Sequence, residues 1–166
     1  QEYQISDMKT LQMLSDKIEW VKVSGASWQG NGFYYSRYPK PEGSALAAKN
    51  ENHQVFYHKV GTAQSADELV YEDKANAQRF NGVYVSEDEQ FSFLNISDRG
   101  KGKDGNALFY RGKGQKEFTP IVSEITNFSY GIVENIDGGF LIETNENAPN
   151  SKVLFYETKS KTWKPF

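Results

Sequence analysis

Short runs in which aromatic or aliphatic residues alternate with polar ones recur along the chain, and one of them appears three times. The run at residues 54–58 (QVFYH) returns at 107–111 (ALFYR) and at 153–157 (VLFYE), after 53 and then 46 residues. Such alternation predicts β-strands. Because repeats of nearly fifty residues that contain only short strands are typical of β-propellers, each repeat predicts one blade.

Each run is preceded by a pattern that predicts a hairpin: a strand, a short polar turn and a second strand led by phenylalanine. Gly, Asn and Asp in these turns favour tight connections between antiparallel strands. A fourth strand is expected after each run, near residues 68–72, 119–123 and 163–166. In the first predicted hairpin, strands at 23–28 and 33–35 flank a turn at 29–32. In the second, strands at 81–85 and 91–94 flank a turn at 86–90. In the third, strands at 130–133 and 140–142 flank a turn at 134–139.

The whole chain is therefore predicted to be all-β, a partial β-propeller of about three four-stranded antiparallel blades plus an orphan hairpin. A β-sandwich also uses short strands at regular spacing, but it gives no reason for the Phe-Tyr strand to return in register with the hairpin before it. A short helical turn is expected only at residues 44–48. Within one propeller fragment over 1–166, the expected parts are the outer hairpin of a preceding blade at 1–16 and blades at 17–72, 73–123 and 124–166.

Composition narrows the classes of partner. In 166 residues, 37% are hydrophobic and 14% aromatic, which is enough for a buried core. The 19 basic and 22 acidic residues are scattered and give a net charge of −3, so no basic stripe favours nucleic acid as a partner. No apolar run approaches the length that crosses a bilayer, so we expect a soluble chain without a membrane partner.

The chain has no cysteine, which excludes disulfides and thiolate chemistry but leaves the compartment open between the cytoplasm and a periplasm.

The candidate catalytic and metal-binding residues all have structural explanations. The nearest approach to a nucleophile elbow, residues 25–29 (GASWQ), lacks the final glycine and lies in a predicted strand. His53 and His58 are the only histidines; five residues apart on an extended strand they point to opposite faces, and surface positions are expected for both. The glycine-rich loop at 97–105 lacks the endings of a phosphate loop and of a calcium loop. No catalytic residue, metal or cofactor is therefore expected.

Four segments in chain order resemble the propeller domain of the prolyl oligopeptidase (prolyl endopeptidase) family: residues 27–38, 53–72, 97–110 and 144–151. The most specific of them is YHKVGTAQSADE at residues 57–68. The resemblance spans nearly the whole chain but covers only the middle blades of that propeller. In this family a seven-bladed propeller is joined to an α/β-hydrolase domain with a Ser, Asp and His triad, and short peptides are cleaved after proline.

The resemblance implies that the chain is a fragment of a serine-type prolyl endopeptidase and is inactive alone, because the hydrolase sequence is missing. Its propeller would gate and filter the access of oligopeptides to that domain. The implied partners are the hydrolase domain of the same parent chain and an oligopeptide substrate. We also expect self-association, because three blades leave two flanking faces bare. The alternative is a free-standing propeller-like module that binds proteins or acts as a scaffold, and the full-length reading frame distinguishes the two.

Two substrate-lining residues follow from the resemblance by position. Phe80, which precedes Asn81-Gly82, matches an apolar position that lines the family's cavity. Arg99 is the nearest candidate for the substrate-contacting arginine after the second strand of a blade, two residues beyond Ser97, which occupies the direct position. A loop arginine without a role is the alternative for Arg99.

Overall fold

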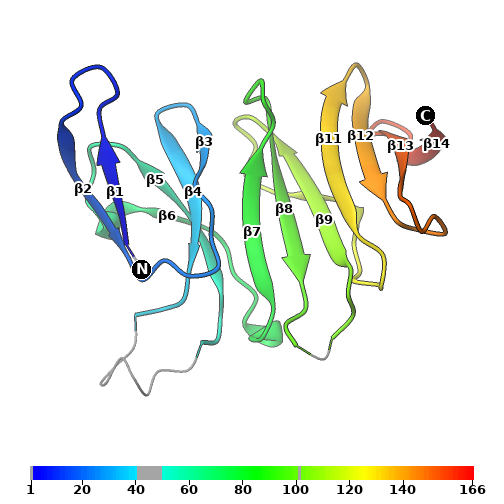
Figure 1. Cartoon of the computed structure of the whole chain (residues 1–166), viewed down its shortest axis with the longest axis horizontal. Helices are drawn as coiled ribbons and strands as arrows, with labels where there is room; N and C mark the ends of the chain where they lie inside the picture. The colour runs from blue at the N-terminus through cyan, green and yellow to red at the C-terminus, as the bar shows by residue number, and fades with distance from the viewer. Residues whose placement is uncertain (1, 41–49, 101) are drawn as a thin grey trace. The chain divides into compact units, whose positions relative to one another are not determined.

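The computed structural model describes residues 2–40, 50–100 and 102–166, and its regular secondary structure is almost entirely β-strand (Figure 1). The helical turn predicted at 44–48 lies outside the described residues. Within those ranges, no helix is long and apolar enough to span a membrane.

The chain divides into two compact units, residues 1–84 and 85–166, which are described in turn. The first unit contains a two-stranded hairpin followed by a four-stranded antiparallel sheet in which spatial order follows chain order. Two short 3-10 helices, η2 (Gln64–Ala66) and η3 (Lys74–Asn76), flank the last strand of this sheet. The strands are β1 (Glu2–Ser6) and β2 (Met13–Glu19) in the hairpin, and β3 (Ser27–Gln29), β4 (Gly32–Arg37), β5 (Gln54–Lys59) and β6 (Glu68–Tyr71) in the sheet.

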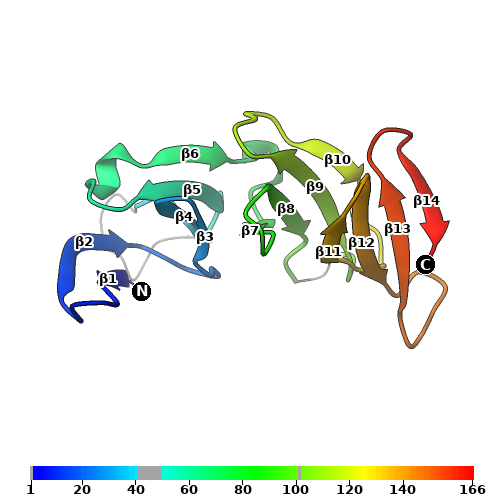
Figure 2. The same ribbon diagram turned by 90° about the horizontal axis from the view of Figure 1, so that it is seen from above.

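Two further four-stranded sheets follow, again with the strands in chain order. The strand β7 (Phe80–Val85) spans the boundary between the units and forms one edge of the first of these sheets. In the second, β14 (Thr162–Pro165) forms one edge (Figure 2). The remaining strands are β8 (Phe91–Ser97), β9 (Asn106–Gly112), β10 (Thr119–Val122), β11 (Tyr130–Ile136), β12 (Gly139–Thr144), β13 (Lys152–Glu157) and β14 (Thr162–Pro165).

These sheets confirm the predicted fold class, and the three Phe-Tyr runs become the third strands β5, β9 and β13. Two local details differ from the sequence pattern. The strand expected from residue 23 begins only at Ser27, because Val23 has a left-handed φ of 50°, which is incompatible with extended backbone. The third hairpin turn is shorter than expected, since β11 continues to Ile136 and Gly138 turns the chain with a φ of +85°.

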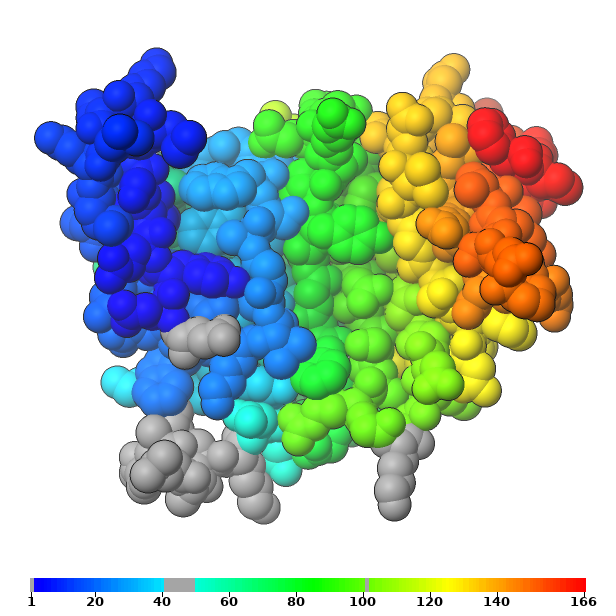
Figure 3. Space-filling model, in the orientation of Figure 1, coloured from blue at the N-terminus to red at the C-terminus, as the bar shows by residue number. Residues whose placement is uncertain are grey.

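In the first unit, the hairpin β1–β2 packs against one face of the sheet β3–β6. The space-filling view shows its dark blue atoms directly against the lighter blue atoms of that sheet (Figure 3). Phe33, which is 1% exposed, lies in this core, and its ring meets the ring of Tyr3 at 6.4 Å between centroids. The buried cluster consists of Ile5, Ile18, Val21, Phe33, Tyr35 and Phe56. Burial of such side chains stabilises the docked hairpin by roughly 2 kcal/mol each.

In the second unit, a phenylalanine at the equivalent place in its sheet makes the same kind of contact. The fully buried Phe140 of β12 meets the rings of Phe91, Phe93 and Tyr110 edge to face, with centroids 5.0, 5.1 and 5.1 Å apart. These three partners come from β8 and β9 of the preceding sheet. In each unit, the phenylalanine that leads the second strand of a sheet therefore packs that sheet onto the strands before it.

Each of these phenylalanines follows a glycine, because the neighbouring strand passes too close for a side chain. A Cβ on Gly32 would overlap the carbonyl oxygen of His58, and a Cβ on Gly139 would overlap that of Tyr156. Both contacts are with backbone, which cannot rotate away. The glycines thus let β4 and β12 approach their partners closely enough to bury the phenylalanines.

Replacing Gly139 by alanine is expected to lower the free energy of unfolding by about 1–3 kcal/mol, the usual cost of overpacking. The matched control is Gly131→Ala in the neighbouring strand β11, where an added Cβ meets nothing within 4 Å. Chemical denaturation of both variants measures the difference. Equal stabilities would show that the close approach of β12 and β13 does not constrain residue 139.

Candidate functional site

Phe80, one of the two predicted substrate-lining residues, is the first residue of β7 and is half-buried. It follows η3, whose first turn is capped by the Asp73 carboxylate accepting from the backbone N–H of Ala75. The Phe80 ring meets the ring of His53 edge to face at 5.8 Å between centroids. His53 therefore packs against one side of the Phe80 ring.

His53 is buried, with 1% of its surface exposed, so the surface position expected for it is wrong. The backbone N–H of Asn81 donates to His53 Nδ1 over 2.9 Å, and this fixes Nδ1 as an acceptor. Nε2 consequently carries the proton and donates to the carbonyl of Lys22, 2.9 Å away. Burial lowers the pKa of His53, against the weaker opposing effect of the bond to the Lys22 carbonyl. The ring is a neutral imidazole held in one tautomer.

Three connecting segments meet at this histidine. Lys22 belongs to the link between β2 and β3, His53 precedes β5, and Asn81 lies at the start of β7. The Asn81 side chain also donates to the carbonyl of His53 at 2.8 Å, and the Ser36 hydroxyl donates to the carbonyl of Asn81 at 2.7 Å. The Tyr38 ring lies 4.9 Å from the imidazole. These hydrogen bonds around His53 hold the backbone at Asn81, the residue next to Phe80, in place.

Arg99, the second predicted residue, lies in the link after β8 and is exposed. Ser97, the last residue of β8, is half-buried. Phe80 belongs to the first unit and Arg99 to the second. The role of both in lining a substrate site stays a prediction.

The other histidine, His58, is completely buried between two carboxylates, so a surface position is wrong for it as well. Its Nε2 lies 2.5 Å from Asp16 Oδ2 and its Nδ1 lies 2.6 Å from Asp67 Oδ1. The side chains of Asp16 and Asp67 are 2% and 1% exposed. Because a carboxylate only accepts, both ring nitrogens face hydrogen-bond acceptors.

Each of the two carboxylates also accepts a second hydrogen bond. The Tyr35 hydroxyl donates to Asp67 Oδ2 over 2.5 Å, and the backbone N–H of Gly61 donates to Asp16 over 2.8 Å. Burial works to raise the pKa of Asp16, but the hydrogen bond from His58 and that from the Gly61 N–H outweigh it and hold the pKa below its ordinary value. Burial, reinforced by the Asp67 carboxylate, raises the pKa of the Tyr35 hydroxyl well above its usual range.

This buried network, Asp16–His58–Asp67 with Tyr35, joins the hairpin strand β2 to the sheet β3–β6. It pairs a histidine with carboxylates, as a catalytic triad does, but both ring nitrogens are occupied and neither can activate a nucleophile. Within the described ranges there is also no group of His, Asp or Glu side chains arranged to hold a metal ion. The geometry therefore supports a structural role.

Sequence reasoning missed both histidine centres. The signal for the His58 centre lay in the segment 57–68, where His58 and Asp67 stand nine residues apart at the two ends of the link between β5 and β6. Its other partner, Asp16, lies 42 residues before His58, and no local pattern connects them.

Comparison with known proteins places these features in a family. The family model for the prolyl oligopeptidase N-terminal β-propeller domain matches residues 1–165. Prolyl endopeptidases of Elizabethkingia meningoseptica and Elizabethkingia miricola are 36% and 32% identical to the chain, and each alignment covers 96% of it. The chain spans only 23% of the length of these two relatives.

A solved structure gives the same match in three dimensions. Prolyl oligopeptidase B from Galerina marginata, bound to a 35mer hydrolysis and macrocyclization substrate, superimposes with a TM-score of 0.82 and 28% identity. The match covers 93% of this chain and 22% of that one. The resemblance found in the sequence is thus confirmed by both sequence and fold.

Replacing Asp16 by alanine is expected to destabilise the first unit by about 3 kcal/mol, because it leaves Nε2 of the buried His58 and the Gly61 N–H without an acceptor. The control is Glu19→Ala on the same strand, whose ion pair with Lys17 is half exposed and should contribute little. Urea denaturation followed by tryptophan fluorescence measures both. A loss no larger for Asp16→Ala than for the control would contradict a stabilising network.

The contribution of His53 to stability should fall as the pH drops below the ordinary histidine pKa of 6.5. The unfolded chain then binds a proton that the buried, neutral His53 resists, so protonation favours unfolding until the pH passes below the lowered folded-state pKa. This site contributes at most about 1.4 kcal/mol per pH unit. Unfolding free energies at pH 7.5, 6.5 and 5.5 should show a smaller slope for His53→Phe than for the wild type, and identical slopes would refute the assignment.

Proposed function

The chain belongs to the prolyl oligopeptidase family through its N-terminal β-propeller domain, and we propose that it is part of the propeller of a serine-type prolyl endopeptidase. In this function the propeller gates and filters the access of oligopeptides to an α/β-hydrolase domain that this chain does not contain. The observation that carries the proposal is the match of the family model along residues 1–165, while the relatives are more than four times longer.

The architecture is suited to this task. Each four-stranded sheet, with the link that leads into it, corresponds to one blade in the proposed division of the chain at residues 17–72, 73–123 and 124–166. The links at one end of each blade would face the hydrolase domain. Phe80, fixed by the buried His53, would present an apolar face to a peptide, and Arg99 would offer a cation to its carbonyl groups.

Catalysis would come from the rest of the parent protein. Ser27 lies in the strand β3 rather than on a sharp strand-to-helix turn. The ring nitrogens of His53 and of His58 are engaged in the structural contacts described above. The proposed partners are therefore the hydrolase domain of the same parent chain and an oligopeptide that passes the propeller.

Self-association of the separate chain is a further part of the proposal. Large apolar side chains are exposed on the hairpin and its turn, where Met8 is 86%, Leu11 80% and Met13 61% exposed. Val133 and Ile136 of β11 are exposed as well. Contacts between copies would remove this apolar surface from water.

The test uses the intact protein that contains this chain. It should hydrolyse short proline-containing peptides, with a rate that falls steeply as the substrate grows from about ten residues to a folded protein. Phe80→Ala should raise KM for the short peptides about tenfold with a smaller change in kcat, because binding loses an apolar contact. The control is Phe118→Ala, which removes another half-buried phenylalanine, stacked on Arg111.

Two results would overturn the proposal. An intact protein without peptidase activity would favour a binding or scaffold module. Equal cleavage of short peptides and folded proteins would remove the filtering role.

A further inference from the structure

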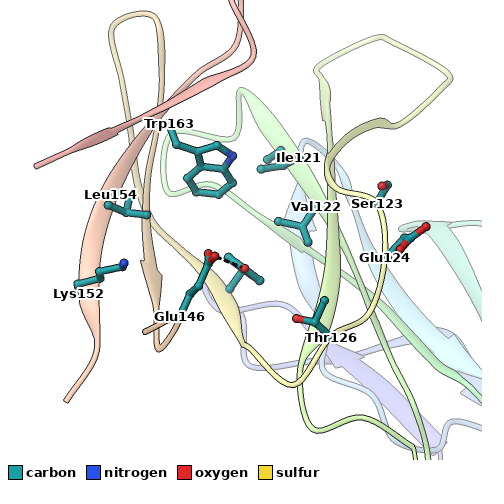
Figure 4. Close-up of a pocket in the computed structure, with 10 residues that line it drawn as sticks. Ile121, Val122, Ser123, Glu124, Thr126, Glu146, Lys152, Leu154 and Trp163 are labelled. Carbon is teal, nitrogen blue, oxygen red and sulfur yellow. Dashed lines mark hydrogen bonds between the residues drawn. The ribbon is translucent and has the colours of Figure 1, made fainter. Parts of the chain in front are cut away.

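The second unit contains a cavity of about 590 Å³ between the strand β10 with its following link and the sheet β11–β14 (Figure 4). Neither Phe80 nor Arg99 lines it. The lining residues are Ile121, Val122, Ser123, Glu124, Thr126, Tyr130, Glu146, Lys152, Leu154 and Trp163.

Two walls of the cavity are apolar and one of them is aromatic. Figure 4 shows Ile121 and Val122 on one side, with Leu154 and Trp163 opposite. The Trp163 ring is held by Tyr156, with centroids 5.0 Å apart, and by Tyr130 at 5.9 Å. The indole is thus fixed before any ligand arrives.

A carboxylate is positioned beside this aromatic wall. The Tyr130 hydroxyl donates to Glu146 Oε2 over 2.9 Å, and the Glu146 backbone N–H donates to Thr144 Oγ1 over 3.1 Å. Burial and the neighbouring Glu146 raise the pKa of Tyr130 to about 12, so its hydroxyl stays a donor at neutral pH. Glu146 is half-buried and oriented by these contacts.

The charges around the cavity favour a cation. Glu124 and Glu146 contribute two negative charges, and Lys152, which is exposed, contributes one positive charge. Because Glu146 is the charge held in place beside the indole, a ligand cation there meets both a carboxylate and an aromatic face.

We propose that this cavity binds a cationic side chain, a guanidinium or an ammonium group, carried by an extended peptide segment. A guanidinium fills only a small part of the volume, which leaves room for the neighbouring peptide atoms. Both walls also include edge strands, since β10 and β14 each end their sheets. Edge strands offer unpaired backbone groups to an extended segment. Binding here does not depend on the proposed peptidase activity.

The test measures binding to the intact protein by calorimetry, with acetyl-Ala-Arg-Ala-amide as the probe. This peptide lacks proline, so a prolyl peptidase centre would not be measured. Its matched control replaces arginine by citrulline, which has nearly the same shape and no charge. The arginine peptide should bind at least about fivefold more tightly, and more weakly as salt is added.

Variants at the cavity should act in opposite directions. Glu146→Gln should weaken binding about fivefold, while Lys152→Gln should strengthen it about twofold, because each changes the net charge beside the cation by one unit in the opposite sense. Trp163→Leu should weaken binding about threefold through loss of the aromatic face. Glu143→Gln, an exposed carboxylate in β12, is the matched control and should change nothing.

The circular dichroism of each variant shows whether it folds, and the gain expected for Lys152→Gln cannot arise from misfolding. Equal binding of the arginine and citrulline peptides would overturn the proposal, as would reversed signs for Glu146→Gln and Lys152→Gln. Arginine amide binding as tightly as the peptide would show a site for small amines and would overturn the peptide as occupant.

Discussion

The packing of a four-stranded sheet onto the strands before it, seen for β3–β6 in the first unit and for β11–β14 in the second, is the constraint on which each unit depends. A single four-stranded meander cannot bury both of its faces, so its stability comes from its neighbours. Phe33 and Phe140 make that contact from equivalent places, and each sits beside a glycine that lets two backbones approach. The strand led by phenylalanine recurs in the sequence because Phe33 and Phe140 fill the same place in their sheets.

Buried hydrogen bonds fix the relative positions of the elements that the apolar side chains bring together. Apolar surfaces alone allow some sliding, whereas the bonds of His58 to Asp16 and Asp67 have one geometry and fix the hairpin on the sheet. His53 does the same for three links, through backbone groups that would otherwise be buried without partners. The two histidines have opposite electrostatic environments, one among carboxylates and one among neutral groups. The first unit is therefore held by two polar centres of different chemistry.

The strands were predictable because their signal is local. Alternation in the three Phe-Tyr runs is visible within five residues, and it located β5, β9 and β13. The burial of His58 was not predictable in this way, since histidine beside charged residues is usually found at the surface and Asp16 is far away in the sequence. Val23 was misjudged because a β-branched residue rarely adopts a positive φ. Phe80 and Arg99 came from the family resemblance alone, and the cavity, whose lining comes from five separate segments, had no sequence signal.

The buried hydrogen bonds of His58 limit how this protein can change over evolutionary time. Substituting the histidine alone would leave two buried carboxylates facing each other, and substituting either aspartate alone would leave the histidine with half of its acceptors. An apolar replacement becomes acceptable only when all three positions change together, because well-packed apolar groups need no partners. Residues 16, 58 and 67 should therefore be conserved together. In a relative that has a different residue at one of these positions, the other two should differ as well.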